Sequence, residues 1–115
     1  MDKITLINLW FDFYGQLLTE RQQKFIELYY GNNYSLGEIA EAHNVTRQAV
    51  HDTLKRAESM LQNYEQKLQL VDKFLTQRGK LAEAARLLEE CGASAPGQAF
   101  KAREILQQVL EMDRG

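Results

Sequence analysis

The 115-residue chain has very little of the two residue types that most often staple or interrupt a small fold, with one cysteine, Cys91, and one proline, Pro96. A single cysteine cannot close a disulfide within the chain, which excludes a disulfide-stapled scaffold. One proline and seven glycines leave few places where a helix must stop, so the composition predicts an all-α fold. No run approaches the roughly 20 consecutive apolar residues of a membrane span. No signal-like segment follows Met1, so we expect a cytoplasmic protein.

The sequence also lacks an excess of one charge. Lys and Arg total 14 and Asp and Glu total 16, which gives a net charge of -2. No block of like charge is typical of a nucleic-acid-binding tail, so strong non-specific DNA binding is not expected. The length suits one small domain, or one domain with a helical extension.

Chemically active side chains are sparse as well. His43 and His51 are eight residues apart with a predicted turn between them, which does not suit a shared metal ion, and Cys91 is remote in sequence. Gly79-Lys80 lacks the other residues of a phosphate-binding loop. We therefore expect no enzyme activity, no metal site and no cofactor.

Three N-capping patterns divide the first half of the chain. Thr19 with Gln22 and Ser35 with Glu38 have the spacing of a capping box, and Thr46 can cap a third helix. Helices are predicted over residues 20–30 and 35–42 and from 46 onward, with turns at 31–33 and 43–45.

An aromatic first segment precedes these helices. Its apolar residues form two helical faces, one with Ile4, Ile7, Phe11 and Tyr14 and the other with Leu6, Leu9 or Trp10, and Phe13. A helix over residues 4–18 therefore needs cover on two sides. The second cover is either the C-terminal helices or a second subunit.

The helix that begins after Thr46 meets no breaker before Gly79, which predicts about 33 continuous helical residues. Its apolar residues follow a heptad pattern: Val50, Leu54, Ala57, Leu61, Tyr64, Leu68, Val71 and Leu75. This seam can pair with another chain or receive the protein's own helices. We expect intramolecular packing there, together with a homodimer through the same region.

Two further helices are predicted over residues 80–90 and 98–112, separated by turn-forming residues 91–97. Their expected inward residues are Leu81, Ala84, Ala85 and Leu88 on the first, and Ile105, Val109 and Leu106 on the second. The predicted domains are a helix-turn-helix domain over 1–64 and a helical extension over 65–115 that packs on the long helix and on a second subunit.

Residues 35–57 have the pattern of a helix-turn-helix motif. Ala40 is small where two helices cross, Asn44 suits a left-handed turn, and Val50 and Leu54 point inward. The outward side of the second helix then carries the predicted nucleic-acid-binding residues, which are Thr46, Arg47, Gln48, His51, Lys55 and Arg56. Arg and Gln suit base edges in the major groove, and Thr and Lys suit phosphates.

The charge of this motif leaves a second interpretation open. Three positive residues, Arg47, Lys55 and Arg56, are matched by three acids, Glu38, Glu41 and Asp52. Because affinity for DNA depends on phosphate neutralisation, the motif also fits a helical hairpin with a solvated polar face.

Several segments of the chain resemble region 4 of bacterial sigma factors, which reads the promoter -35 element. The segments are Leu18-Thr19-Glu20-Arg21-Gln22, Tyr34-Ser35-Leu36-Gly37-Glu38-Ile39-Ala40-Glu41, Val45-Thr46-Arg47-Gln48-Ala49-Val50 and Leu54-Lys55-Arg56-Ala57. Asn44 replaces the glycine usual in that turn.

Residues 4–75 resemble the YlxM family of small bacterial proteins more closely. The shared features are Leu9-Trp10-Phe11-Asp12-Phe13-Tyr14, Phe25-Ile26-Glu27-Leu28-Tyr29-Tyr30, Tyr34-Ser35-Leu36, Arg47-Gln48-Ala49-Val50 with Asp52, and Lys55-Arg56 leading to Tyr64-Glu65. The resemblance implies a sigma region 4-like helix-turn-helix core and a DNA-binding regulator associated with the signal recognition particle pathway. The alternative is an adaptor that binds the particle's GTPase or its RNA rather than DNA.

Overall fold

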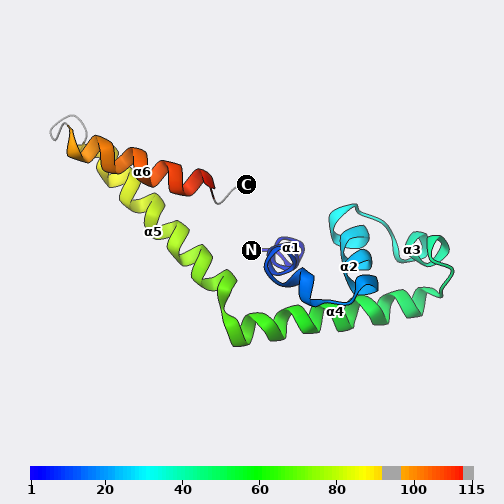
Figure 1. Cartoon of the computed structure of the whole chain (residues 1–115). Helices are drawn as coiled ribbons and strands as arrows, with labels where there is room; N and C mark the ends of the chain where they lie inside the picture. Colours follow the sequence, from blue (N-terminus) through cyan, green and yellow to red (C-terminus); the bar gives the residue numbers. More distant parts are fainter. Residues whose placement is uncertain (92–96, 113–115) are drawn as a thin grey trace. The chain divides into compact units, whose positions relative to one another are not determined.

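The computed structural model describes residues 1–91 and 97–112, and in these ranges the chain is helical with no strand (Figure 1). The α-helices are α1 Lys3–Tyr14, α2 Glu20–Ile26, α3 Leu36–Ala42, α4 Arg47–Leu68, α5 Leu70–Cys91 and α6 Gln98–Met112. A 3-10 turn, Gly15–Leu17, follows α1, and a π-helical turn, Glu27–Gly31, extends α2. The predicted all-α class is confirmed. No helix in the described ranges is long and apolar enough to cross a membrane.

The chain divides into two compact units, Met1–Val71 and the part from Asp72 onward. The division falls later than the boundary after residue 64 that the sequence pattern suggested, because Val71 belongs to the first core. Packing of the C-terminal helices on α4 stays a prediction.

The core of the first unit forms where α1, α2 and α3 pack against α4. Phe25, Ile39 and Leu61 are fully buried contributions from α2, α3 and α4. The predicted inward row of α4 is confirmed for Val50, Leu54, Ala57 and Leu61, all of which are buried. Burial of this 4-3-4 row makes α4 the support on which the shorter helices rest.

All three predicted N-caps are present. The Thr19 and Ser35 hydroxyls accept hydrogen bonds from Gln22 and Glu38, whose side chains bond back to the cap amides. The Thr46 hydroxyl accepts from the Ala49 amide at 3.0 Å. These bonds satisfy amides that a helix leaves unpaired at its first turn, which fixes where α2, α3 and α4 begin.

The prediction of a single long helix is wrong, because the helix is interrupted at Gln69. Gln69 has a left-handed φ of 55° and separates α4 from α5. The Glu65 carboxylate accepts from the Val71 amide at 3.0 Å and from the Tyr14 hydroxyl at 2.6 Å, and this hydroxyl accepts from the Leu70 amide at 3.1 Å. Glu65 and Tyr14 thus cap the start of α5. Leu68 is 46% exposed, so the buried heptad row of α4 ends before this residue.

The predicted break at Gly79 is also wrong, because α5 is continuous through it to Cys91. A glycine costs a helix only about 1 kcal/mol, which neighbouring turns can offset. The predicted bounds of α6 are confirmed.

The two helices of the second unit run antiparallel. Arg78 of α5 donates to the Leu110 carbonyl at 2.9 Å, and Glu89 lies 3.8 Å from Arg103, nearer the connection between the helices. Leu81, Ala84, Ala85 and Leu88 are buried or half-buried as predicted, and so is Leu106. The inward assignment of Ile105 and Val109 is wrong, since they are 60% and 37% exposed.

Candidate nucleic-acid interface

Helices α3 and α4 with the turn between them form the motif that the sequence predicts. The turn begins at His43, and Asn44 adopts a left-handed φ of 56°. The Val45 amide then donates to the Ala40 carbonyl at 3.0 Å, which closes the turn. Buried Ala40 lets the two helices approach closely, so the motif has the backbone of a helix-turn-helix.

The structure brings most of the predicted binding residues to one surface of α4. All six are exposed, and Thr46 uses its hydroxyl as the N-cap. Gln48, His51 and Lys55 follow one another at spacings of three and four residues, so they form one row opposite the buried row of α4. Arg56 lies on the far side of this row, about 100° around the helix from Lys55. Three side chains, Gln48, His51 and Lys55, can therefore approach one ligand together, and Arg47 flanks them at the start of α4 beside α3.

Arg47 is positioned by α3. A Cβ atom built on Gly37 would lie 3.0 Å from both Nε and Nη2 of Arg47, so the guanidinium rests against the glycine backbone. A Cβ at position 37 would require this guanidinium to shift by a few tenths of an ångström. Gly37 thus leaves room for the Arg47 side chain beside α3, a role that the sequence did not reveal.

Asp52 weakens the attraction of this surface for an anion. Its Oδ1 accepts a hydrogen bond from the Gln48 amide nitrogen at 2.9 Å and lies 3.6 Å from Nδ1 of His51. Gln48 must give up this bond before it can pair with a base edge. The carboxylate also opposes the positive potential of Arg47 and Lys55.

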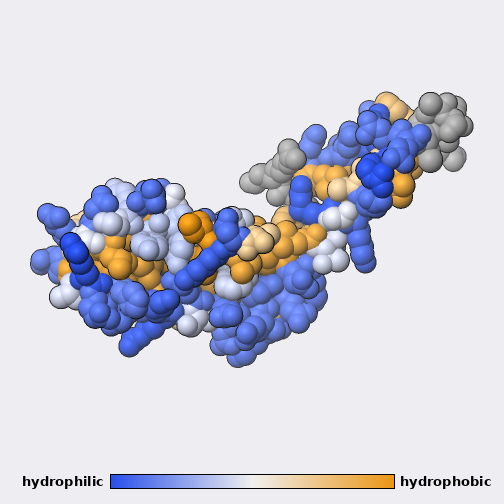
Figure 2. Space-filling model, turned by 180° about the vertical axis from the view of Figure 1, so that it is seen from behind, coloured by the Kyte–Doolittle hydropathy of each residue, from blue (hydrophilic) through white to orange (hydrophobic). Residues whose placement is uncertain are grey.

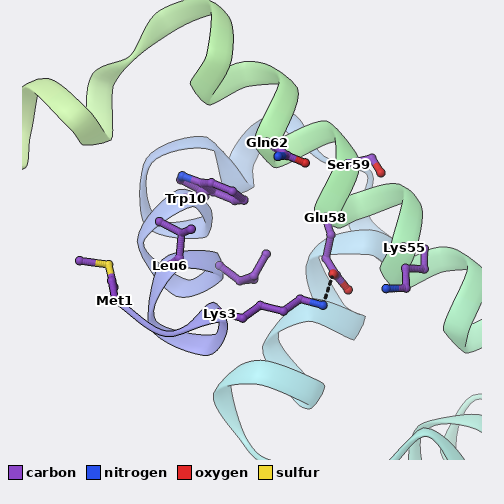
Figure 3. A pocket seen from close by; sticks show the side chains of 9 residues that line it. Met1, Lys3, Leu6, Trp10, Lys55, Glu58, Ser59 and Gln62 are labelled. Atoms are coloured by element: carbon purple, nitrogen blue, oxygen red, sulfur yellow. Dashed lines mark ion pairs between the residues drawn. The ribbon is translucent and has the colours of Figure 1, made fainter.

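A cavity of about 510 Å³ continues the row of α4 toward α1 (Figure 3). Ser59 and Gln62 extend the exposed row beyond Lys55 and line one side of the cavity, while Lys3 and Trp10 of α1 line the other. Sequence reasoning missed these four residues, because α1 reaches this place only through tertiary packing. The one sequence signal for these residues was the helical spacing that places Ser59 and Gln62 on the same face as Lys55.

Glu58 lines this cavity and contacts residues of two neighbouring segments. Its carboxylate lies 3.1 Å from Nζ of Lys3, and its side chain is 14% exposed. It also accepts a hydrogen bond from the Tyr30 hydroxyl. The pKa of Tyr30 is raised mainly by burial of this hydroxyl and secondly by the bond to Glu58. A second cavity of about 650 Å³, lined by Lys3, Tyr29 and Tyr34, adjoins the same place. Aromatic and basic side chains therefore flank the row of α4.

The two histidines do not form a site. The His43 ring packs edge-on against Phe25 with centroids 5.1 Å apart, whereas His51 is exposed on α4. In the part of the chain that the structure describes, no group of three His, Cys, Asp or Glu residues could hold a metal ion. The side chain of Cys91 lies outside the described residues.

Comparison with known proteins supports the resemblance found in the sequence. The model of the UPF0122 family, described as "Putative helix-turn-helix protein, YlxM / p13 like", matches residues 1–91. A UPF0122 protein of Desulforamulus reducens is 58% identical over 113 residues and covers 96% of each chain. UPF0122 proteins of Shouchella clausii and Acetivibrio thermocellus are 43% and 44% identical, over 98% and 96% of this chain and 99% and 93% of theirs.

Proposed function

Because the chain belongs to the YlxM / p13-like helix-turn-helix family, we propose that it is a cytoplasmic DNA-binding regulatory protein. The observation that carries this proposal is the exposed row Gln48, His51 and Lys55, beside Arg47, on the second helix of an intact helix-turn-helix. Such a helix enters the major groove with its N-terminal residues on base edges.

The roles of the side chains follow from their chemistry. Arg47 and Gln48 are placed for base edges, since Arg pairs with guanine and the amide of Gln with adenine. Thr46 and Lys55 suit phosphates, which fix register without reading sequence, whereas Arg56 lies too far around α4 to join them. Since few cations contribute and Asp52 opposes them, binding is weak and sensitive to salt.

The test is a titration of the full chain against labelled genomic DNA fragments at several salt concentrations. We expect log affinity to fall with log salt with a slope of about -2 to -3, as two or three phosphates are neutralised. A flat titration at low salt would overturn the proposal.

Replacing Asp52 with asparagine should tighten DNA binding about 3- to 10-fold for every sequence, because one repulsive charge beside the phosphates is removed. Asparagine still accepts the hydrogen bond from Gln48, so the geometry is kept. Asp12→Asn, an exposed acid on α1, is the matched control. Equal gains for the two variants, measured by fluorescence anisotropy, would show that Asp52 acts only through net charge.

We also propose a homodimer through the second face of α1. Phe13 of this face and Leu17 of the turn that follows α1 stay exposed on the first unit, and large apolar side chains left open near one another are typical of interfaces. Two copies related by a two-fold axis could read half-sites about 34 Å apart. We expect light scattering at micromolar concentration to give twice the chain mass, and a monomer would exclude this dimer.

The second candidate is an adaptor for the signal recognition particle. The observation that favours it is the balance of three cations and three acids in residues 35–57, which weakens the case for phosphate binding. We expect such an adaptor to retain the particle's GTPase or its RNA in a pull-down. Recovery of neither component, together with salt-dependent DNA binding, would decide for the first proposal.

A further inference from the structure

The hairpin of α5 and α6 has little core of its own. Ala85 is its one buried side chain among the described residues after Asp72, and the rows that face each other, such as Leu81, Leu88 and Leu106, are only half-buried. Figure 2 shows apolar surface left open along this hairpin. Two helices bury only one stripe each, so a second apolar stripe stays exposed until another element covers it.

An ion pair between α5 and α6 marks one edge of this hairpin. On α5, Glu89 directly follows the inward residue Leu88, and on α6 Arg103 follows the half-buried Ala102. Their contact at 3.8 Å shows that residues following the inward positions meet along one edge. Residues that precede the inward positions therefore lie along the opposite edge of both helices.

We call this opposite edge the lysine edge. It consists of the row Lys73, Lys80 and Leu87 on α5, spaced by seven residues, and the row Lys101, Ile105 and Val109 on α6, spaced by four. Leu87, Ile105 and Val109 are 47%, 60% and 37% exposed. The edge therefore offers three exposed apolar side chains together with two lysines on α5 and one on α6.

The charges of the hairpin are segregated. None of the three lysines of the edge forms an ion pair with a described residue. The neighbouring acids are engaged with arginines: Glu83, which adjoins the lysine edge, and Glu90 pair with Arg86, and Glu89 pairs with Arg103. The lysine edge thus carries three lysines without an ion pair to a described residue, beside an uncovered apolar strip.

We propose that the lysine edge binds an amphipathic helix of a partner protein whose apolar stripe is flanked by Asp or Glu. A helix laid along this edge, across α5 and α6, would cover Leu87, Ile105 and Val109, and its acids would pair with the lysines. This inference does not depend on nucleic-acid binding by α4.

Two other occupants fit the edge less well. A second copy related by a two-fold axis would set each lysine row against lysines of its partner, which costs electrostatic energy. A membrane surface is usually met by Trp or Phe beside basic residues, and the six residues of the edge include no aromatic side chain.

The test uses two synthetic helical peptides with the same leucine stripe, one flanked by glutamates and one by lysines. With the full chain, we expect the glutamate peptide to bind at least about tenfold more tightly in fluorescence anisotropy, and less so as salt rises. Lys80→Glu with Lys101→Glu should reverse the preference. Lys24→Glu with Lys67→Glu makes the same charge change on the first unit and should leave it unchanged.

Three results would overturn the proposal. The first is equal binding of the two peptides. The second is binding of phosphatidylserine vesicles that Ile105→Ser abolishes, with no peptide preference. The third is a dimer of the chain alone that Ile105→Ser dissociates in light scattering. If the charge-reversed variant loses helicity, Lys80→Gln with Lys101→Gln replaces it, and the preference should then shrink rather than reverse.

Discussion

The double variant Arg47→Ala, Lys55→Ala is expected to bind duplex DNA about 10- to 100-fold more weakly than the parent chain at low salt. Both side chains are exposed on the first turns of α4 and neither belongs to the core, so their loss leaves the core unchanged. Each cation that leaves a phosphate lowers the salt slope by about one unit. The affinity and the slope should therefore fall together, and anisotropy titrations at several salt concentrations measure both.

Two variants separate the surface of α4 from a general charge effect. Lys24→Ala with Lys67→Ala removes the same charge from exposed positions outside the motif and should change affinity far less. Gly37→Ala keeps Arg47 but shifts its guanidinium slightly, so it should weaken binding only modestly, while thermal stability rises because alanine favours the helix more than glycine. An equal loss in the two double variants would show that DNA does not use the row of α4.

The sequence predicted those parts of the fold that are set by residues a few positions apart. The Thr19 and Ser35 capping boxes and the left-handed Asn44 each depend on contacts within four residues, so spacing alone revealed them. The exposed row of α4 followed from the same local periodicity. For this reason the predicted binding residues do lie together, except Arg56.

The missed features depend on residues distant in sequence. The break at Gln69 needs Tyr14, which lies 51 positions before Glu65, and no local signal announces it. The cavity beside Lys55 needs Lys3 and Trp10 from the first helix. Ile105 and Val109 have the correct helical spacing, but periodicity does not say which flank of an apolar stripe meets the neighbouring helix.

Replacing Glu65 with alanine is expected to lower the free energy of unfolding of the first unit by about 2–4 kcal/mol. The carboxylate accepts from the buried Tyr14 hydroxyl and from the Val71 amide, so its loss leaves two donors without an acceptor. Hydrogen bonds to a charged group contribute about 1.5–3 kcal/mol each. Urea denaturation followed by circular dichroism measures the change.

Tyr14→Phe and a pH series show whether the stability lost in Glu65→Ala comes from the hydrogen bonds of Glu65 with Tyr14. Phenylalanine removes the hydroxyl but fills the same space, so we expect about 1–2 kcal/mol, with the double variant less destabilised than the sum of the two. Burial, then the bond to Glu65, raises the pKa of Tyr14 above 10.0. The unfolded chain therefore loses this proton first, and the parent should lose stability above pH 10.0, Tyr14→Phe less so. Additive losses would mean that Glu65 supports the break at Gln69 without Tyr14.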